Sequence, residues 1–257
     1  MTAIEPDPAA AIRAVAALAD SVRQQLYDYV RSARTPVSRE QAAAATGISV
    51  KLAAFHLDKL VGIGLLRSHT APAGRRKVGR SPKLYVPAEV DIAVSIPERH
   101  HDLLAAILVD AVQAQGTDEP ARDSALRAAR QRGHAIAAAE RARLRTGRLG
   151  AERALALSEN LLNRHGYQAC RVSTGCLSLR NCPFHPVVEQ ARDLVCNINH
   201  AFLDGMLAGL EVDSVRAVLE PHPGECCVQL RTAPKARSRA GDTEGAERAG
   251  NTEGNSE

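Results

Sequence analysis

The stretch Ser38–Leu66, SREQAAAATGISVKLAAFHLDKLVGIGLL, decides how the N-terminal part of this chain folds. Ser38 and Gln41 have the spacing of a capping box, so a short helix is expected to begin here. The TGIS sequence at residues 46–49 predicts a turn, because its glycine can adopt a positive φ and its serine can cap the next helix. That helix is expected to continue to about Ile63. Two helices joined by a tight turn are therefore predicted.

The flanking segments complete a predicted winged helix-turn-helix domain over residues 1–97. Apolar residues recur at helical spacing over Pro8–Arg31, which predicts one long opening helix. After the helix pair, segments 64–67 and 82–86 have the pattern of two short strands around the loop 71–81. Two strands joined by such a loop indicate a wing.

Basic residues gather around the predicted wing. The span from Arg67 to Pro87 contains no acidic residue and these six cations: Arg67, Arg75, Arg76, Lys77, Arg80 and Lys83. In a chain whose formal net charge is only +4, they make a strong local field, and nucleic-acid phosphates are its natural counterion. The alternative is a winged fold used only for protein contacts, with this loop as a solvated surface.

The second helix of the pair is expected to enter the major groove of double-stranded DNA. Its inner face is predicted to consist of Leu52, Ala53, Leu57 and Leu60, while His56 could lie on either face. The residues expected to contact bases or phosphates, from this helix and the wing together, are Ser49, Val50, Lys51, Ala54, Phe55, Lys59, Arg75, Arg76, Lys77, Arg80 and Lys83.

The second half of the chain has a different pattern of predicted elements. Long helical patterns occupy residues 98–115, 119–145 and 151–164, so the region 98–165 is expected to link the domains and to form a homodimer. Residues 166–233 predict an α+β domain, with a hairpin over 169–179, a helix over 191–209 and strands over 215–219 and 226–230. Residues 234–257 offer almost nothing to bury and are expected to form a disordered tail. The whole chain is thus predicted to be α+β and mainly helical.

Length and composition agree with this division. At 257 residues the chain can form two domains, and 45% hydrophobic but only 3% aromatic residues favour helices packed through small aliphatic side chains. The N-terminus lacks the basic and apolar segments of a secretory signal, and no apolar run reaches the length of a membrane span. A cytoplasmic protein without membrane contact is expected, in which cysteines serve as thiols or metal ligands.

All six cysteines lie in the predicted α+β domain: Cys170, Cys176, Cys182, Cys196, Cys226 and Cys227. Cys182 stands at a strand-to-helix corner, Cys196 in a helix, and the Cys226-Cys227 pair at the entry to a strand, so they can converge only through tertiary folding. There is no C-x-x-C motif, whereas structural zinc sites more often use closely spaced pairs. Several scattered thiolates suit an iron-sulfur cluster.

These residues resemble the SufR-type iron-sulfur-dependent regulators, which are winged-helix proteins related to the ArsR and DeoR groups. The resemblance covers most of the chain to about Leu230, and its marks are AFHLDKL at 54–60, GLL at 64–66, GRSPKLY at 79–85, NCPFH at 181–185, Val195-Cys196 and Cys226-Cys227. It implies a homodimer with a four-iron (4Fe-4S) cluster in each C-terminal domain, which represses cluster-assembly genes while the cluster is intact. It also implies that Cys182, Cys196 and either Cys226 or Cys227 are ligands.

Several alternatives stay open at this point. The fourth ligand could be His185, Cys176, Cys170 or a non-cysteine oxygen, and His200 beside Cys196 on one helical face would also suit zinc. The same thiols could form a redox switch or pack as small hydrophobes, and the domain could instead sense a small molecule. A thiol enzyme built on Cys182 and His185 is not expected, because no third orienting residue or substrate-binding motif accompanies them.

Control of DNA binding follows as a hypothesis. Ligation would hold the Cys182 corner, the Cys196 helix and the terminal strand in one arrangement, and the interdomain helices would carry it to the wings. In a dimer, two recognition helices must stand about 34 to 36 Å apart to meet successive major grooves. Loss of the cluster is expected to release that spacing.

Overall fold

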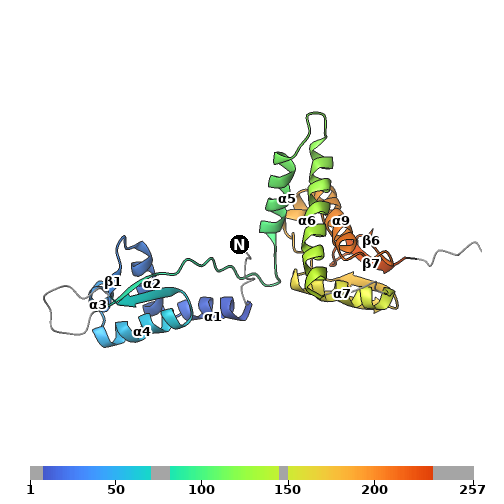
Figure 1. Cartoon of the computed structure of the whole chain (residues 1–257). Helices are drawn as coiled ribbons and strands as arrows, with labels where there is room; N and C mark the ends of the chain where they lie inside the picture. The colour runs from blue at the N-terminus through green and yellow to red at the C-terminus, as the bar shows by residue number, and fades with distance from the viewer. Residues whose placement is uncertain (1–7, 71–81, 145–149, 234–257) are drawn as a thin grey trace, which may run out of the picture. The chain divides into compact units, whose positions relative to one another are not determined.

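The computed structural model describes residues 8–70, 82–144 and 150–233, and it is an α+β protein with two small antiparallel sheets (Figure 1). The chain divides into two compact units, Met1–Ile96 (unit 1) and Pro97–Glu257 (unit 2). The predicted tail at 234–257 lies outside the described residues. None of the described helices combines the length and the apolar character needed to cross a membrane.

In its described residues, unit 1 has four helices and one three-stranded sheet. The helices are α1 (Pro8–Leu18), α2 (Ser21–Ser32), α3 (Arg39–Thr46) and α4 (Val50–Gly62). The sheet has the order β1 (Val37–Ser38), β3 (Lys83–Pro87) and β2 (Leu66–Thr70), and both pairings are antiparallel. Strand β1 was not predicted from the sequence, because a strand of two residues is too short to show an alternating pattern.

The prediction of one opening helix was wrong. Helix α1 ends at Leu18, and Asp20 begins α2 as its N-cap, with extended backbone angles and a side chain that accepts a 3.0 Å hydrogen bond from the Arg23 amide. The Arg23 side chain in turn donates to the Ala17 carbonyl at 2.6 Å. A local capping residue therefore overrides a continuous apolar stripe.

The expected start of α3 and the turn after it are confirmed. Ser38 Oγ accepts from the Gln41 amide at 3.2 Å, and Gln41 Oε1 accepts from the Ser38 amide at 2.8 Å, so the capping box is complete. Gly47 adopts a φ of +69° at the end of α3, and Ser49 Oγ accepts from the Leu52 amide at the start of α4. Local side-chain hydrogen bonds thus fix where α3 and α4 begin.

Unit 2 has five helices in its described residues and a four-stranded sheet. The helices are α5 (His101–Gln113), α6 (Ala121–Leu144), α7 (Ala151–Arg164), α8 (Val187–Gln190) and α9 (Arg192–Gly209). The sheet has the order β4 (Ala169–Ser173), β5 (Cys176–Leu179), β7 (Val228–Thr232) and β6 (Val215–Leu219), all antiparallel. The predicted helices and hairpin agree with these bounds within three residues, and the one-turn helix α8 was not predicted.

Helix α6 packs directly on α9, so the helical segment 98–165 and the cysteine-bearing segment share one hydrophobic core (Figure 1). Glycines allow the close approach. A Cβ atom at Gly133 of α6 would clash with the Phe202 carbonyl oxygen, and one at Gly205 of α9 would clash with the Arg130 carbonyl oxygen. The segment that the sequence analysis set apart as an interdomain linker is therefore part of the same compact unit as the cysteines.

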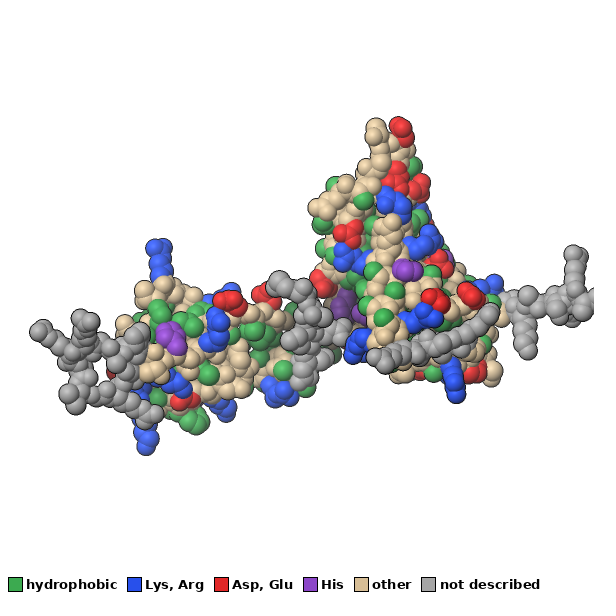
Figure 2. All heavy atoms as spheres, in the orientation of Figure 1, with side chains coloured by type: hydrophobic (Ala, Val, Ile, Leu, Met, Phe, Trp, Pro, Cys, Tyr) green, Lys and Arg blue, Asp and Glu red, His purple; other side chains and the backbone are tan. Residues whose placement is uncertain are grey.

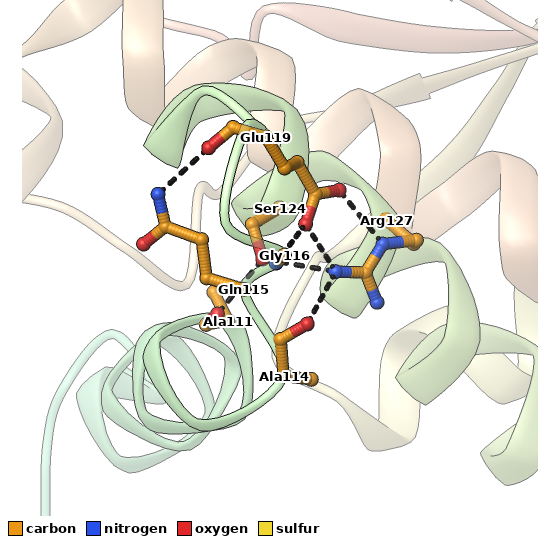
Figure 3. Close-up of polar contacts among 7 residues, drawn as sticks. All are labelled: Ala111, Ala114, Gln115, Gly116, Glu119, Ser124 and Arg127. Carbon is orange, nitrogen blue, oxygen red and sulfur yellow. Dashed lines mark hydrogen bonds and ion pairs between the residues drawn. The ribbon is translucent and has the colours of Figure 1, made fainter.

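The corner between α5 and α6 is held by an arginine-centred network (Figure 3). Arg127 donates to both carboxylate oxygens of Glu119, at 2.9 and 2.6 Å, and to the Ala114 carbonyl at 3.0 Å. Ser124 Oγ donates to the Ala111 carbonyl at 2.8 Å. These contacts satisfy free carbonyls at the end of α5 and fix the hairpin that carries α6 to its position on α9.

This corner predicts an acid-sensitive contribution to stability. The hydrogen bond from Arg127 lowers the pKa of Glu119 from 4.5 to about 2. A lowered pKa means that the stabilisation is fully present above pH 4.5 and is lost as the pH falls toward 2. Thermal unfolding should show a gap between the native chain and Glu119→Gln that shrinks between pH 5 and pH 2, at roughly constant ionic strength. Asp118→Asn, at the neighbouring exposed carboxylate, is the control and should show no such gap.

Candidate metal centre and nucleic-acid surface

Four cysteine thiols of unit 2 meet at one end of the sheet. Cys182 follows β5, Cys196 lies on α9, and Cys226 and Cys227 precede β7. Strands β5 and β7 are neighbours, and the Cys226 amide donates to the Leu179 carbonyl at 2.8 Å, which brings the two strand ends together. The thiols form a row of neighbours that influence one another's ionisation, Cys182 with Cys226, Cys226 with Cys227, and Cys227 with Cys196.

Three of these four cysteines face an open pocket of about 650 Å³. Cys182, Cys196 and Cys227 contribute to its wall, together with the predicted candidate ligand His185. Three arginines also line it: Arg99, Arg180 and Arg192. Cys226, which is 1% exposed, does not belong to the wall. Cys227 therefore lines the pocket and Cys226 does not, whereas the sequence left open which of the two would be the candidate ligand.

Cys226 belongs instead to a buried polar chain. Asn199 of α9 donates from Nδ2 to the Cys226 sulfur at 3.1 Å, and the Tyr167 hydroxyl donates to Asn199 Oδ1 at 2.6 Å. Asn199 and Tyr167 are both fully buried. Sequence reasoning missed these two residues. The one available signal was that Asn199 stands three positions after Cys196, on the same side of a helix.

The thiols of this row differ in their pKa values. The hydrogen bond from Cys226 lowers the pKa of Cys227 to about 6, helped by Cys196 and Asn199. The same Cys226 thiol lowers the pKa of Cys182. Burial raises the pKa of Cys196 to about 12. At neutral pH Cys227 is thus the thiol most ready to act as a thiolate, the form that binds metals.

The other candidate ligands lie apart from this row. Cys176 donates to Gln229 Oε1 at 3.6 Å, and Cys170 lies on β4, one strand further from β7. His200 contacts the Ala217 carbonyl at 3.2 Å and is not part of the pocket wall. His185 is bonded to Glu189 at 2.9 Å but does line the pocket.

Within the described ranges, no three His, Cys, Asp or Glu side chains surround a common point as a preassembled metal site would. The chemistry of the donor set nevertheless fits a soft metal or an iron-sulfur cluster, because thiolates are the ligands these centres select. The residues that fit such a role are Cys182, Cys196 and Cys227, with His185 of the same pocket wall as the candidate fourth donor.

Most of the residues predicted to meet DNA in α4 are on its outer surface. Ser49, Val50, Lys51, Phe55 and Lys59 are exposed, with Phe55 at 61%, and Ala54 is half-buried. His56 is buried, and the prediction that Leu52 faces the core was wrong, because it is 41% exposed. The inward stripe of α4 is Ala53, His56, Leu57 and Leu60, which is the regular helical spacing from Ala53 onward. On the face in view in Figure 2, unit 1 carries Lys and Arg side chains interspersed with apolar ones.

Two of the six cations near the predicted wing are described, and both have carboxylate partners. Lys83 Nζ lies 2.5 Å from Asp58 of α4, and the Tyr85 hydroxyl donates to the same carboxylate at 2.9 Å. Arg67 lies 2.8 Å from Glu89. Asp58 thereby ties β3 to α4, which gives Lys83 a structural role beside its predicted one. Arg75, Arg76, Lys77 and Arg80 lie outside the described residues.

Comparison of the chain with protein-family models, curated proteins and solved structures gives no match.

Proposed function

We propose that the chain is a DNA-binding transcriptional regulator whose unit 1 is a winged helix-turn-helix domain. The observation that carries this proposal is the outer surface of α4. It exposes Val50, Leu52 and Phe55 beside Lys51 and Lys59, on a helix that follows a capped tight turn. Apolar groups suit thymine methyls and cations suit phosphates, so the surface has the chemistry that major-groove binding needs.

Unit 2 is, in this proposal, the sensor. Three of its four neighbouring thiols face an open pocket, which favours an iron-sulfur cluster of the 4Fe-4S type held by Cys182, Cys196 and Cys227. Such a cluster would form when iron is sufficient and would be lost when iron is scarce or the cluster is oxidised. The chain's own residues supply the thiolates, the arginines that balance their negative charge, and the connection to unit 1.

A homodimeric repressor acting in the cytoplasm is the form of the regulator that we propose. Two copies can present two α4 helices to successive major grooves, and a coupling of about 1 to 3 kcal/mol between sensor and DNA changes affinity roughly 5- to 150-fold. A zinc or thiol redox sensor is the second candidate, favoured by the lowered pKa of Cys227. A small-molecule sensor is the third, favoured by the pocket of about 650 Å³. An enzymatic role is not proposed.

Metal and DNA measurements together test the proposal. Anaerobic purification is followed by analysis of iron, sulfide and zinc. Iron with sulfide supports the cluster, zinc alone supports the zinc sensor, and neither leaves the thiol redox and small-molecule sensors. Binding to a pool of double-stranded fragments, with and without the bound group, then tests the regulator. Absence of salt-dependent binding in both states would contradict DNA binding, whatever the metal content.

Substitutions on α4 should change the salt dependence of DNA binding. If Lys51 and Lys59 each neutralise one phosphate, replacing either with Ala should make the slope of log affinity against log salt less steep by about 0.9 per subunit. Fluorescence anisotropy with a labelled duplex from 50 to 200 mM salt measures this slope. Arg31→Ala, at an exposed cation in the last turn of α2, is the matched control and should leave the slope unchanged.

A further inference from the structure

The loop that carries Cys182 is bonded to the first residues of unit 2. Arg99 donates to the Cys182 carbonyl at 2.7 Å and also to Asn181 Oδ1. The same arginine lines the pocket that the thiols face. Arg99, the third residue of unit 2, therefore holds both the backbone of Cys182 and the side chain of Asn181.

Further hydrogen bonds join the same two segments. Asn181 Nδ2 donates to the Glu98 carbonyl at 2.9 Å and to the Gly166 carbonyl. The His100 amide donates to the Pro183 carbonyl at 2.9 Å, and His101 Nε2 lies 2.9 Å from the His185 carbonyl. Residues 98–101 and 181–185 thus form one hydrogen-bonded assembly, which we call the anchor.

The anchor lies next to the chain segment that leads to unit 1. Unit 2 begins at Pro97, so residues 98–101 continue directly into the chain that leads to unit 1. Cys182 lies in the loop bonded to them and faces the pocket. A displacement of the Cys182 backbone would move the carbonyl to which Arg99 donates.

We propose that Arg99 and Asn181 are positioning residues that transmit the state of the Cys182 loop to the chain leading to unit 1. The inference rests on the proposed sensor function and says how the sensor would act on unit 1. The effect would pass through the first residues of unit 2, and not through the long helices alone. Asn181 is 5% exposed, so loss of Arg99 leaves its buried Oδ1 without the guanidinium donor and loosens the assembly.

Amide hydrogen exchange of the full chain tests the route directly. The variants are Arg99→Gln, which removes the charged donor, Arg99→Lys, which restores one, and Arg216→Gln as the control. Arg216 is an exposed arginine of β6 that lies outside both the anchor and the pocket wall. Each protein is measured without metal and after anaerobic reconstitution with Fe²⁺ and sulfide, with iron and sulfide content determined in parallel.

The expected result is selective. Arg99→Gln should raise exchange at residues 98–101 about tenfold in the metal-free protein, comparable to the loss of one buried hydrogen bond. Reconstitution should slow these amides in the native chain, in Arg99→Lys and in Arg216→Gln, but not in Arg99→Gln. The DNA affinities of loaded and metal-free Arg99→Gln should also differ less than those of the native chain.

Two outcomes would overturn the inference, and they are distinguishable. If every variant loads iron and sulfide and Arg99→Gln responds at residues 98–101 as the native chain does, the route is wrong while the sensor proposal stands. If the native chain takes up no iron and sulfide, the proposed cluster fails and the inference that rests on it fails too.

Discussion

Replacing Cys227 with Ser is expected to lower the iron and sulfide content of the anaerobically reconstituted protein at least tenfold, because it removes the proposed ligand whose thiol pKa is lowered to about 6. Cys182→Ser and Cys196→Ser should have effects of the same size, since both side chains face the pocket. Iron and sulfide analysis together with visible absorption measures the loss.

Two further variants make this prediction specific. Cys226→Ser should retain the cluster, because Cys226 lies outside the pocket wall and a serine hydroxyl can still accept from Asn199. Cys170→Ser, on β4, should also retain it. Retention in Cys227→Ser with loss in Cys226→Ser would reverse the assignment of the two adjacent cysteines. Loss in all variants, Cys170→Ser included, would indicate unfolding instead of ligand removal, and far-UV circular dichroism of each variant checks that.

Replacing Gly205 with Ala should strongly destabilise unit 2. Its Cβ would clash with the Arg130 carbonyl oxygen of α6, a backbone atom that moves only if the two helices separate. Overpacking of this kind costs about 3 kcal/mol, and the unfolding midpoint should fall by on the order of 10 °C. Scanning calorimetry of the full chain measures the shift.

Gly62→Ala provides the comparison for that experiment. Gly62 is the last residue of α4, and a Cβ there meets no atom within 4 Å. Alanine in a helix is favoured over glycine by about 0.5 to 1 kcal/mol, so this change should leave the midpoint unchanged or raise it slightly. Equal destabilisation by both substitutions would contradict the close α6–α9 contact as the cause.

Local signals in the sequence predicted the elements well where a side chain bonds to the backbone a few residues away. The Ser38–Gln41 capping box and the Gly47 turn are examples, because their partners lie within the same short segment. The opening helix was predicted wrongly for a related reason. Its apolar spacing continues past Asp20, but the capping bond of that single residue outweighs the pattern.

The candidate site was predictable in its residue types and less so in its arrangement. Sequence pattern singled out Cys182, Cys196 and the Cys226-Cys227 pair, but adjacent residues have the same local signal. Only packing distinguishes them, since Asn199 and Tyr167 hold Cys226 inside while Cys227 faces the pocket. No spacing rule connects Tyr167 with Cys226, because the bonds between them cross from one element to another.

The sequence by itself determined the α+β class, the positions of most helices, and the concentration of all six cysteines in the second half of the chain. These properties depend on periodicity and on bonds between near neighbours. The tertiary structure alone decided that α6 packs on α9, that four thiols form one row, and that Arg99 holds the Cys182 loop. Those contacts join residues far apart in the chain, and they exist only after the core has brought the elements together.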